Sequence, residues 1–338
     1  MFNLSKLTFY MLLMLGTIIS ISSNTWPAIW MGLEINLMAF IPILYMKNNL
    51  LASEASLKYF LVQALASSLL LMSFITFNLF PLTNIFQLNY HLLITTILMI
   101  KMGAAPFHMW FPMVMEGCSW MNCIILMTWQ KLAPLMIISY LNNSNTLMMI
   151  IINLSLLIGS LGGLIQTSTR KIMAYSSINH IGWMLSAILM STNYWMIYFM
   201  IYSFLSFSMI MIFKMMSLYH VNQINMNNYP SLFKMILMLN MLSLGGLPPF
   251  LGFLPKWMIL NLMTQQNMMF LMLIMVFTSL ITLFYYMKLS MNSLLLMPIQ
   301  IKSNLIHNQY LFPPFLLILF SSITILGLPS FYIFQFLA

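Results

Sequence analysis

The 338-residue sequence contains no aspartate and only three glutamates, so it offers very few acidic groups for chemistry. Charged residues make up 4% of the chain, whereas a soluble protein of this length would carry roughly 80 of them. Hydrophobic residues make up 62%, and apolar runs recur at intervals of about 30 residues, close to one membrane span plus a short loop. This scarcity of charge excludes an ordinary water-soluble protein and predicts a polytopic membrane protein.

Cysteine is almost absent as well. Cys118 and Cys123 share one apolar stretch and are too few for a disulfide framework, an iron–sulfur cluster or a structural zinc site. The sequence also lacks a Rossmann glycine fingerprint and paired intramembrane histidines for haem. The net charge of +9 comes from basic residues that stand apart, with Arg170-Lys171 as the one adjacent pair, so we expect no nucleic-acid binding.

The apolar runs are continuous and do not alternate in the manner of barrel strands, so we expect an all-α polytopic membrane protein. The first run follows Lys6 without a small-residue cleavage motif and is expected to be retained as a span. About eleven transmembrane helices are predicted, near residues 3–22, 26–45, 54–77, 88–115, 120–141, 146–166, 170–190, 193–218, 231–264, 267–290 and 311–336.

The charges in the loops and near the ends of these spans sort to one side of the membrane. With eleven spans, the N-terminus and alternate loops share a side, and the opposite loops carry no charge. The positive-inside rule therefore places the N-terminus on the matrix or cytoplasmic side and the C-terminus on the other. The charges on that side are Lys6, Lys47, Lys58, Arg170, Lys171, Lys214, Lys234, Lys288, Lys302, Glu54 and Glu116.

Four charges lie well inside predicted spans: Glu34, Lys101, Lys131 and Lys256. A charge at the bilayer centre costs about 2.5–3.5 kcal/mol on insertion scales, so each needs a reason to be there. The alternative to function is a snorkelling lysine or a passive ion pair. Glu34 and Lys131 are too near the middle of their spans for snorkelling, which favours a functional role.

Two spans are interrupted by glycine and proline in matching ways. Residues 103–112 and 246–255 both follow the pattern G-x-x-P-F-x-x-[WF]-x-P, at a constant offset of 143 residues. Proline removes a backbone hydrogen bond, so each span should break there, near 103–112 and 245–255. The spans are five apart and run in opposite directions. This arrangement predicts an inverted-repeat core in one membrane domain, with halves at about 3–141 and 146–290, followed by a loop and last helix in 291–338.

Five motifs resemble the antiporter-like chain 2 family of mitochondrial NADH:ubiquinone oxidoreductase, respiratory complex I. They are GLEIN (32–36), KMGAAPFHMWFP (101–112), TWQKLAP (128–134), RK (170–171) with YSSINHIGW (175–183), and LGGLPPFLGFLPKW (244–257). The composition, with 39 Met and very few Val, also resembles an invertebrate mitochondrial gene. The resemblance implies a multi-pass protein of the mitochondrial inner membrane, with the N-terminus in the matrix and the C-terminus in the intermembrane space.

The resemblance also implies a proton-pumping subunit that binds no cofactor itself. NADH, FMN, iron–sulfur clusters and ubiquinone are expected in other subunits. Its expected partners are the other membrane-arm and accessory subunits, together with phospholipids. Glu34 and Lys101 would form a switchable ion pair, in contact directly or through one water, with Lys131 as a central relay and Lys256 as a terminal carrier. His180 and His108 are further candidates for the relay, with structural hydrogen bonding as the alternative role.

Two other classes remain open from the sequence. A freestanding secondary cation/proton antiporter would share the inverted repeat and the lysines, although the chain has no aspartate pair for sodium. A purely structural membrane scaffold would explain the hydrophobicity but not the four buried charges.

Overall fold

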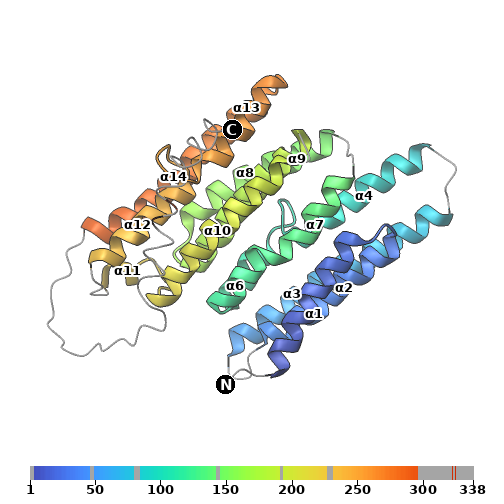
Figure 1. Ribbon diagram of the computed structural model, residues 1–338, viewed down its shortest axis with the longest axis horizontal. Helices are drawn as coiled ribbons and strands as arrows, with labels where there is room; N and C mark the ends of the chain where they lie inside the picture. Colours follow the sequence, from blue (N-terminus) through green and yellow to red (C-terminus); the bar gives the residue numbers. More distant parts are fainter. Residues whose placement is uncertain are drawn as a thin grey trace. The chain divides into compact units, whose positions relative to one another are not determined.

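The computed structural model describes residues 4–45, 49–79, 84–141, 145–190, 193–226, 231–295, 322 and 324. Within these ranges the regular structure is helical, apart from one isolated bridge between Ser168 and His220. The helices, drawn in Figure 1, are α1 Leu4–Ser22, α2 Trp26–Leu44, α3 Leu50–Leu79, α4 Asn84–Met102, α5 Trp110–Gly117, α6 Trp120–Met127, α7 Trp129–Tyr140, α8 Asn145–Ile165, α9 Thr169–Met190, α10 Tyr194–Met215, α11 Gln223–Met226, α12 Ser231–Gly245, α13 Phe253–Gln265 and α14 Met269–Leu295.

Six segments of the described chain are long and apolar enough to cross a membrane. They are Trp26–Leu44, Leu50–Leu79, Trp120–Tyr140, Thr146–Ile165, Tyr194–Met215 and Met269–Met291. Shorter apolar helices cover Lys6–Ser22, Tyr90–Met102 and Phe233–Gly245. An all-helical, multi-pass membrane protein is therefore confirmed. The expected span at 311–336 and the charges Lys47 and Lys302 lie outside the described residues, so the total of about eleven spans stays a prediction.

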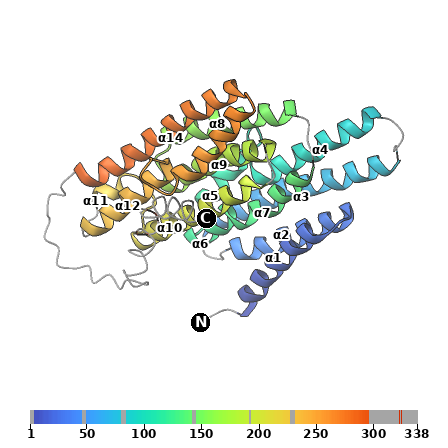
Figure 2. The same cartoon turned by 45° about the horizontal axis from the view of Figure 1, so that its top comes forward.

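The chain divides into two compact units, Met1–Ser155 and Leu156–Ala338, with the boundary inside α8. In the first unit α1 packs along α2, and α3 lies against α2, α4 and α5. Figure 2 shows α3 and α4 running side by side. Helix α7 packs against α4, α6 and α1. These contacts bring the middle of α2, the end of α4 and the start of α7 into one interior.

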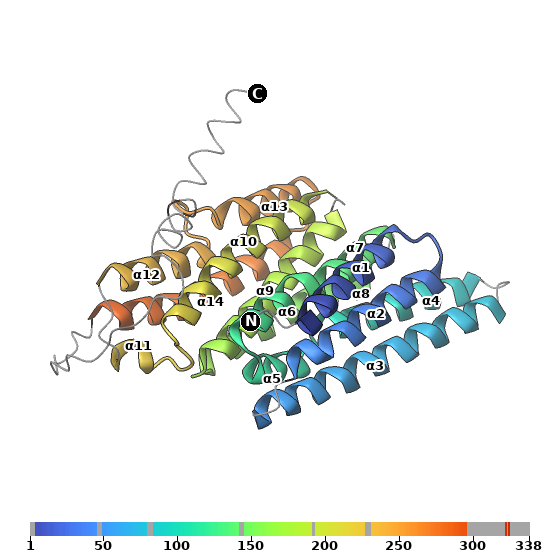
Figure 3. The same ribbon diagram turned by 60° about the horizontal axis from the view of Figure 1, so that its bottom comes forward.

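In the second unit α12 lies along α14 and also contacts α10, as can be followed in Figure 3. Helix α13 packs against α9, α10 and α14. Most of the 22 residues of α9 are buried, including Ser176, Ser177, Asn179 and His180. The polar side chains of α9 are therefore enclosed by protein, which removes them from contact with lipid.

One local feature differs from the sequence-based expectation. The span predicted at 120–141 is two helices, α6 and α7, with Thr128 between them. The Thr128 hydroxyl donates to the carbonyl of Ile124 at 2.7 Å, a side-chain bond that competes with the backbone and often bends a helix. Lys234 lies near the start of α12, within the span predicted at 231–264, and is buried.

Candidate functional site

The first backbone feature of the site is the end of α4 at Met102. Gly103 has a positive φ of 72°, a conformation that costs glycine little. The Gly103 N–H bonds to the carbonyl of Ile100 at 3.2 Å, and the Ala104 N–H bonds to that of Met99 at 3.0 Å. This pair of bonds is the Schellman arrangement, which ends a helix at a glycine.

The end of α12 at Gly245 repeats this arrangement at an offset of 143 residues. Gly246 has φ of 79°, and its N–H bonds to the carbonyl of Ser243 at 3.1 Å. The Leu247 N–H bonds to the carbonyl of Leu242 at 3.4 Å. Beyond both glycines the chain stays outside regular α-helix until α5 and α13 begin. The sequence repeat thus coincides with a repeat of backbone hydrogen bonding.

The two helix ends differ in the side chains that bind their last carbonyls. At the end of α4, the Trp110 indole donates to the carbonyl of Ile100 and the Gln63 amide donates to that of Lys101, each at 3.1 Å. At the end of α12, the Lys256 ammonium donates to the carbonyl of Gly245 at 2.8 Å. A helix C-terminus carries partial negative charge, so a cation is stabilised there.

Glu34 and Lys101 lie in the interior of the first unit, on α2 and in the last turn of α4. The Lys101 side chain is 6% exposed, and the Glu34 carboxylate interacts with its ammonium electrostatically. The direct ion pair in the described part of the chain joins Lys58 to Glu54, and Glu34 makes none there. The buried Glu34 Oε2 has no hydrogen-bond partner among the described residues. A pair bridged by one water therefore stays a prediction.

Three neutral polar side chains form a hydrogen-bonded network in the same interior. The Gln130 amide donates to Asn36 Oδ1 at 3.0 Å, and the Tyr59 hydroxyl donates to Gln130 Oε1 at 3.2 Å. Asn36 lies two residues after Glu34, and Gln130 directly precedes Lys131. These two hydrogen bonds therefore link α2, α3 and α7 close to Glu34 and Lys131 in sequence.

Lys131 and His108 complete the set of predicted residues in the first unit. Lys131 is 1% exposed, and its ammonium lies over the Phe111 ring, 5.0 Å from the centroid. His108 is buried in the segment between α4 and α5, with Nδ1 3.3 Å from the carbonyl oxygen of Pro106. An aromatic face stabilises a cation when water is excluded, so Phe111 is a favourable neighbour for the charged form of Lys131.

Lys256 and His180 lie in the second unit, on α13 and α9. The Lys256 ammonium is 5.7 Å from the centroid of the Trp183 ring, in addition to its bond to Gly245. His180 Nδ1 is 2.7 Å from the Tyr198 hydroxyl. The Tyr198 ring stacks on Trp183, with centroids 6.4 Å apart and planes 10° apart. His180 and Lys256 thus approach the same aromatic pair.

Several polar residues at the site were not predicted from the sequence. Asn36 and Gln130 stood inside motifs without an assigned role, and Gln63, Tyr59 and Tyr198 were not singled out. For Gln63 and Asn36 the available signal was an amide in the middle of an otherwise apolar run, where each unsatisfied polar group is costly. Tyr198 gave no such signal, because α10 is rich in aromatic residues.

If His180 takes part in proton transfer, as the sequence predicts, Tyr198→Phe should lower proton uptake severalfold. The substitution removes the hydroxyl that contacts Nδ1 of His180 and orients the imidazole ring. The cost in stability should be about 1–3 kcal/mol, because one buried imidazole nitrogen loses its partner. Proton uptake by membranes and the melting temperature measure the two effects. Tyr140→Phe, at an exposed position, is the matched control. Unchanged uptake in Tyr198→Phe would remove the His180–Tyr198 pair from the proton path.

No group of three or more metal-binding side chains is found in the part of the chain that the structure describes. Cys118 and Cys123 are both buried and are not joined in a disulfide. The candidate site therefore consists of lysines, one glutamate, two histidines and their neutral hydrogen-bonding partners.

Fold and site together define a multi-pass helical membrane protein with antiporter-like interrupted sequence motifs and buried lysines. Residues 23–282 match the family model described as NADH:quinone oxidoreductase/Mrp antiporter, transmembrane region. The chain is 53% identical over 292 residues to NADH-ubiquinone oxidoreductase chain 2 of Anopheles gambiae, covering 85% of each protein. It is 44% identical over 306 residues to chain 2 of Locusta migratoria, covering 87% of each.

Two solved structures are similar in fold. A chain of respiratory complex I from Thermus thermophilus with bound aureothin superimposes with a TM-score of 0.84 and 21% identity, over 96% of this chain and 78% of the other. A chain of the Mrp complex from Dietzia sp. DQ12-45-1b superimposes with a TM-score of 0.75 and 17% identity, over 84% of this chain and 59% of the other. The protein belongs to the NADH:quinone oxidoreductase/Mrp antiporter membrane family and, within it, to the NADH-ubiquinone oxidoreductase chain 2 family.

Proposed function

We propose that the protein is a proton-translocating subunit of the membrane arm of respiratory complex I, in the mitochondrial inner membrane. Sequence identities of 53% and 44% to NADH-ubiquinone oxidoreductase chain 2 of two insects support the assignment to this complex. The observation that most directly supports proton translocation is the burial of Lys101, Lys131 and Lys256 inside apolar helices, where each is at most 6% exposed. Such burial is costly and is typical of proton relays in membrane proteins.

Glu34 and Lys101 act as the switch of the relay. Burial in a low dielectric disfavours the charged form of an amine, and a nearby carboxylate restores it. Lys101 therefore holds its proton while Glu34 is close and ionised, and releases it when Glu34 is neutralised or drawn away. The electrostatic interaction of the two groups supports this role, and one intervening water would connect them.

Lys131 is the central relay and Lys256 the terminal carrier, with His180 and His108 as additional exchange groups. A lysine is suited to this task because its ammonium can lose a proton when desolvated, whereas an arginine cannot. The Gly245 carbonyl and the Trp183 ring favour the charged state of Lys256 without a carboxylate partner. The hydrogen bond to Tyr198 orients the imidazole of His180 for exchange.

The membrane topology that accompanies this role is an inverted repeat of about eleven spans, with broken helices near 103–112 and 245–255. Its halves are 3–141 and 146–290, and 291–338 forms the C-terminal loop and last helix. The recurrence of the same hydrogen bonds at an offset of 143 residues supports the repeat. The one-sided distribution of loop charges supports a matrix N-terminus and an intermembrane-space C-terminus.

The chain serves an enzyme complex as a non-redox subunit. NADH oxidation and ubiquinone reduction, with FMN and iron–sulfur clusters, belong to other subunits. Its partners are the other membrane-arm subunits, accessory subunits and phospholipids, without nucleic acid. The small number of cysteines supports this division of labour, because a cluster requires several thiolates.

The second candidate function is a freestanding cation/proton antiporter, which the similarity in fold to a chain of an Mrp complex supports. Purification distinguishes the two functions. We expect the chain, solubilised in mild detergent, to co-migrate with a very large assembly that oxidises NADH. Migration alone or as a small oligomer, with cation-driven proton exchange in vesicles, would favour the antiporter instead.

A further inference from the structure

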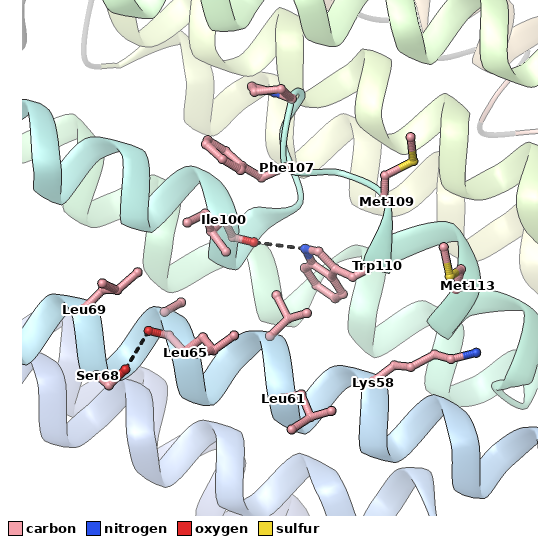
Figure 4. A pocket seen from close by; sticks show the side chains of 13 residues that line it. Lys58, Leu61, Leu65, Ser68, Leu69, Ile100, Phe107, Met109, Trp110 and Met113 are labelled. Atoms are coloured by element: carbon pink, nitrogen blue, oxygen red, sulfur yellow. Dashed lines mark hydrogen bonds between the residues drawn. The ribbon is translucent and has the colours of Figure 1, made fainter.

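A groove of about 640 Å³ lies in the first unit between α3 and the segment that joins α4 to α5. Figure 4 shows Leu61, Leu65 and Leu69 along one wall, with Phe107 and Met109 on the other. These five side chains are between 43% and 64% exposed. The volume falls in the range of about 300–1,000 Å³ that is typical of ligand pockets.

The lining of the groove offers almost no free polar group. The Ser68 hydroxyl donates to the carbonyl of Leu65 at 2.9 Å, and the Trp110 indole donates to that of Ile100 at 3.1 Å. Lys58 is the single charged residue among those that line the groove, and it lies at one end. The interior is therefore suited to an apolar chain, because such a chain leaves no buried polar group unpaired.

The charge pattern of α3 places the groove between the edge of the membrane and its middle. After Lys58, α3 continues without a charge from Tyr59 to Leu79, long enough at 1.5 Å per residue to cross a hydrocarbon core of about 30 Å. Lys58 thus lies at the level of the lipid headgroups. Leu69 lies about 16 Å deeper along the helix. This depth corresponds to one leaflet of the bilayer, which is the length that one acyl chain occupies.

We propose that this groove binds one acyl chain of an anionic phospholipid, whose phosphate contacts the ammonium of Lys58. The contact between Lys58 and Glu54, at 3.4 Å, joins two exposed side chains and is weak enough to admit a phosphate. A membrane helix of a neighbouring subunit, about 10 Å across, needs about twice the volume of the groove over the same length. The site is independent of whether the protein pumps protons.

The test is photo-crosslinking in the assembled complex. Purified complex is placed in phosphatidylcholine vesicles that contain a trace of phosphatidylglycerol or phosphatidylcholine carrying a diazirine on the acyl chain, and labelled peptides are identified by mass spectrometry. We expect residues 61–69 and 106–113 to be labelled about fivefold more by the phosphatidylglycerol probe, the preference that one lysine near a membrane surface provides.

Two substitutions separate the headgroup contact from the groove. Lys58→Met should reduce labelling by phosphatidylglycerol to the level of phosphatidylcholine, whereas Lys6→Met, at another exposed lysine, should not. Leu65→Trp should fill the groove and abolish labelling by both probes, whereas Leu273→Trp, on an exposed apolar face of α14, should leave labelling unchanged.

Three results would overturn the proposal. Equal labelling of the unsubstituted complex by both probes would show ordinary lipid contact without a site. Absence of labelling by either probe would show that another protein covers the groove. Persistence of the phosphatidylglycerol preference in Lys58→Met would show that the headgroup binds elsewhere.

Discussion

Replacing Lys131 with methionine is expected to leave the complex assembled and to lower both proton pumping and ubiquinone reduction. Methionine keeps an unbranched apolar stem in a position that is 1% exposed, so packing against Phe111 is retained. The titrating amine is lost, and a positioned proton-transfer group contributes typically 10²–10⁴-fold, so we expect at least a fall of about a hundredfold in pumping. Vesicle acidification and NADH:ubiquinone reductase activity measure the result.

Lys131→Arg separates charge from titration at this position. Arginine keeps a cation near Phe111 but does not release its proton at physiological pH. If Lys131 carries protons, Lys131→Arg should be as inactive as Lys131→Met. Full activity in the arginine variant would show that only a fixed positive charge is required, and failure of Lys131→Met to assemble would indicate a structural role. Lys6→Met, at an exposed lysine, is the control for the loss of one charge.

The second large effect is expected at Lys256, where two substitutions separate proton transfer from capping. Lys256→Met removes both the titrating amine and the donor to the carbonyl of Gly245. Lys256→Gln keeps an amide donor, on a side chain that is one bond shorter, but has no proton to release. We expect both variants to lose pumping by about a hundredfold, as for a proton-transfer group. Only Lys256→Met should also lower the melting temperature of the complex, because it leaves the helix end without a donor.

The contrast between these two variants decides the role of Lys256. Restored pumping in Lys256→Gln would show that the side chain acts by holding the end of α12 and not by carrying a proton. Equal melting temperatures in the two variants would show that the bond to Gly245 adds little to stability.

The main features of the site could be predicted because they depend on local chemistry. Gly103 and Gly246 end their helices with the same pattern of bonds, and both were located from one ten-residue motif. The burial of Lys101, Lys131 and Lys256 was foreseeable because apolar sequence surrounds each of them for about a helix length. Such features need no knowledge of the tertiary contacts.

The partners of these residues could not be predicted, because they come from helices that are distant in sequence. Asn36 and Gln130 are 94 residues apart, and 71 residues separate Tyr59 from Gln130. The interruption at Thr128 was missed as well, since Pro134 lies six residues later and the hydroxyl bond to Ile124 is visible only in the structure. Periodicity identifies which face of a helix is apolar but does not identify its neighbour.

The enclosure of α9 has a consequence for biogenesis. This helix is absent from the six described segments that are apolar enough to cross a membrane by themselves. Its serines, Asn179 and His180 are buried by protein, and a single polar side chain near the centre of a helix already opposes release from the translocon into lipid. We therefore expect α9 to leave the insertion machinery together with α10, whose Tyr198 binds His180, and not as an independent span. The buried polar groups of α9, among them the proposed exchange group His180, would thus set the order in which the chain enters the membrane.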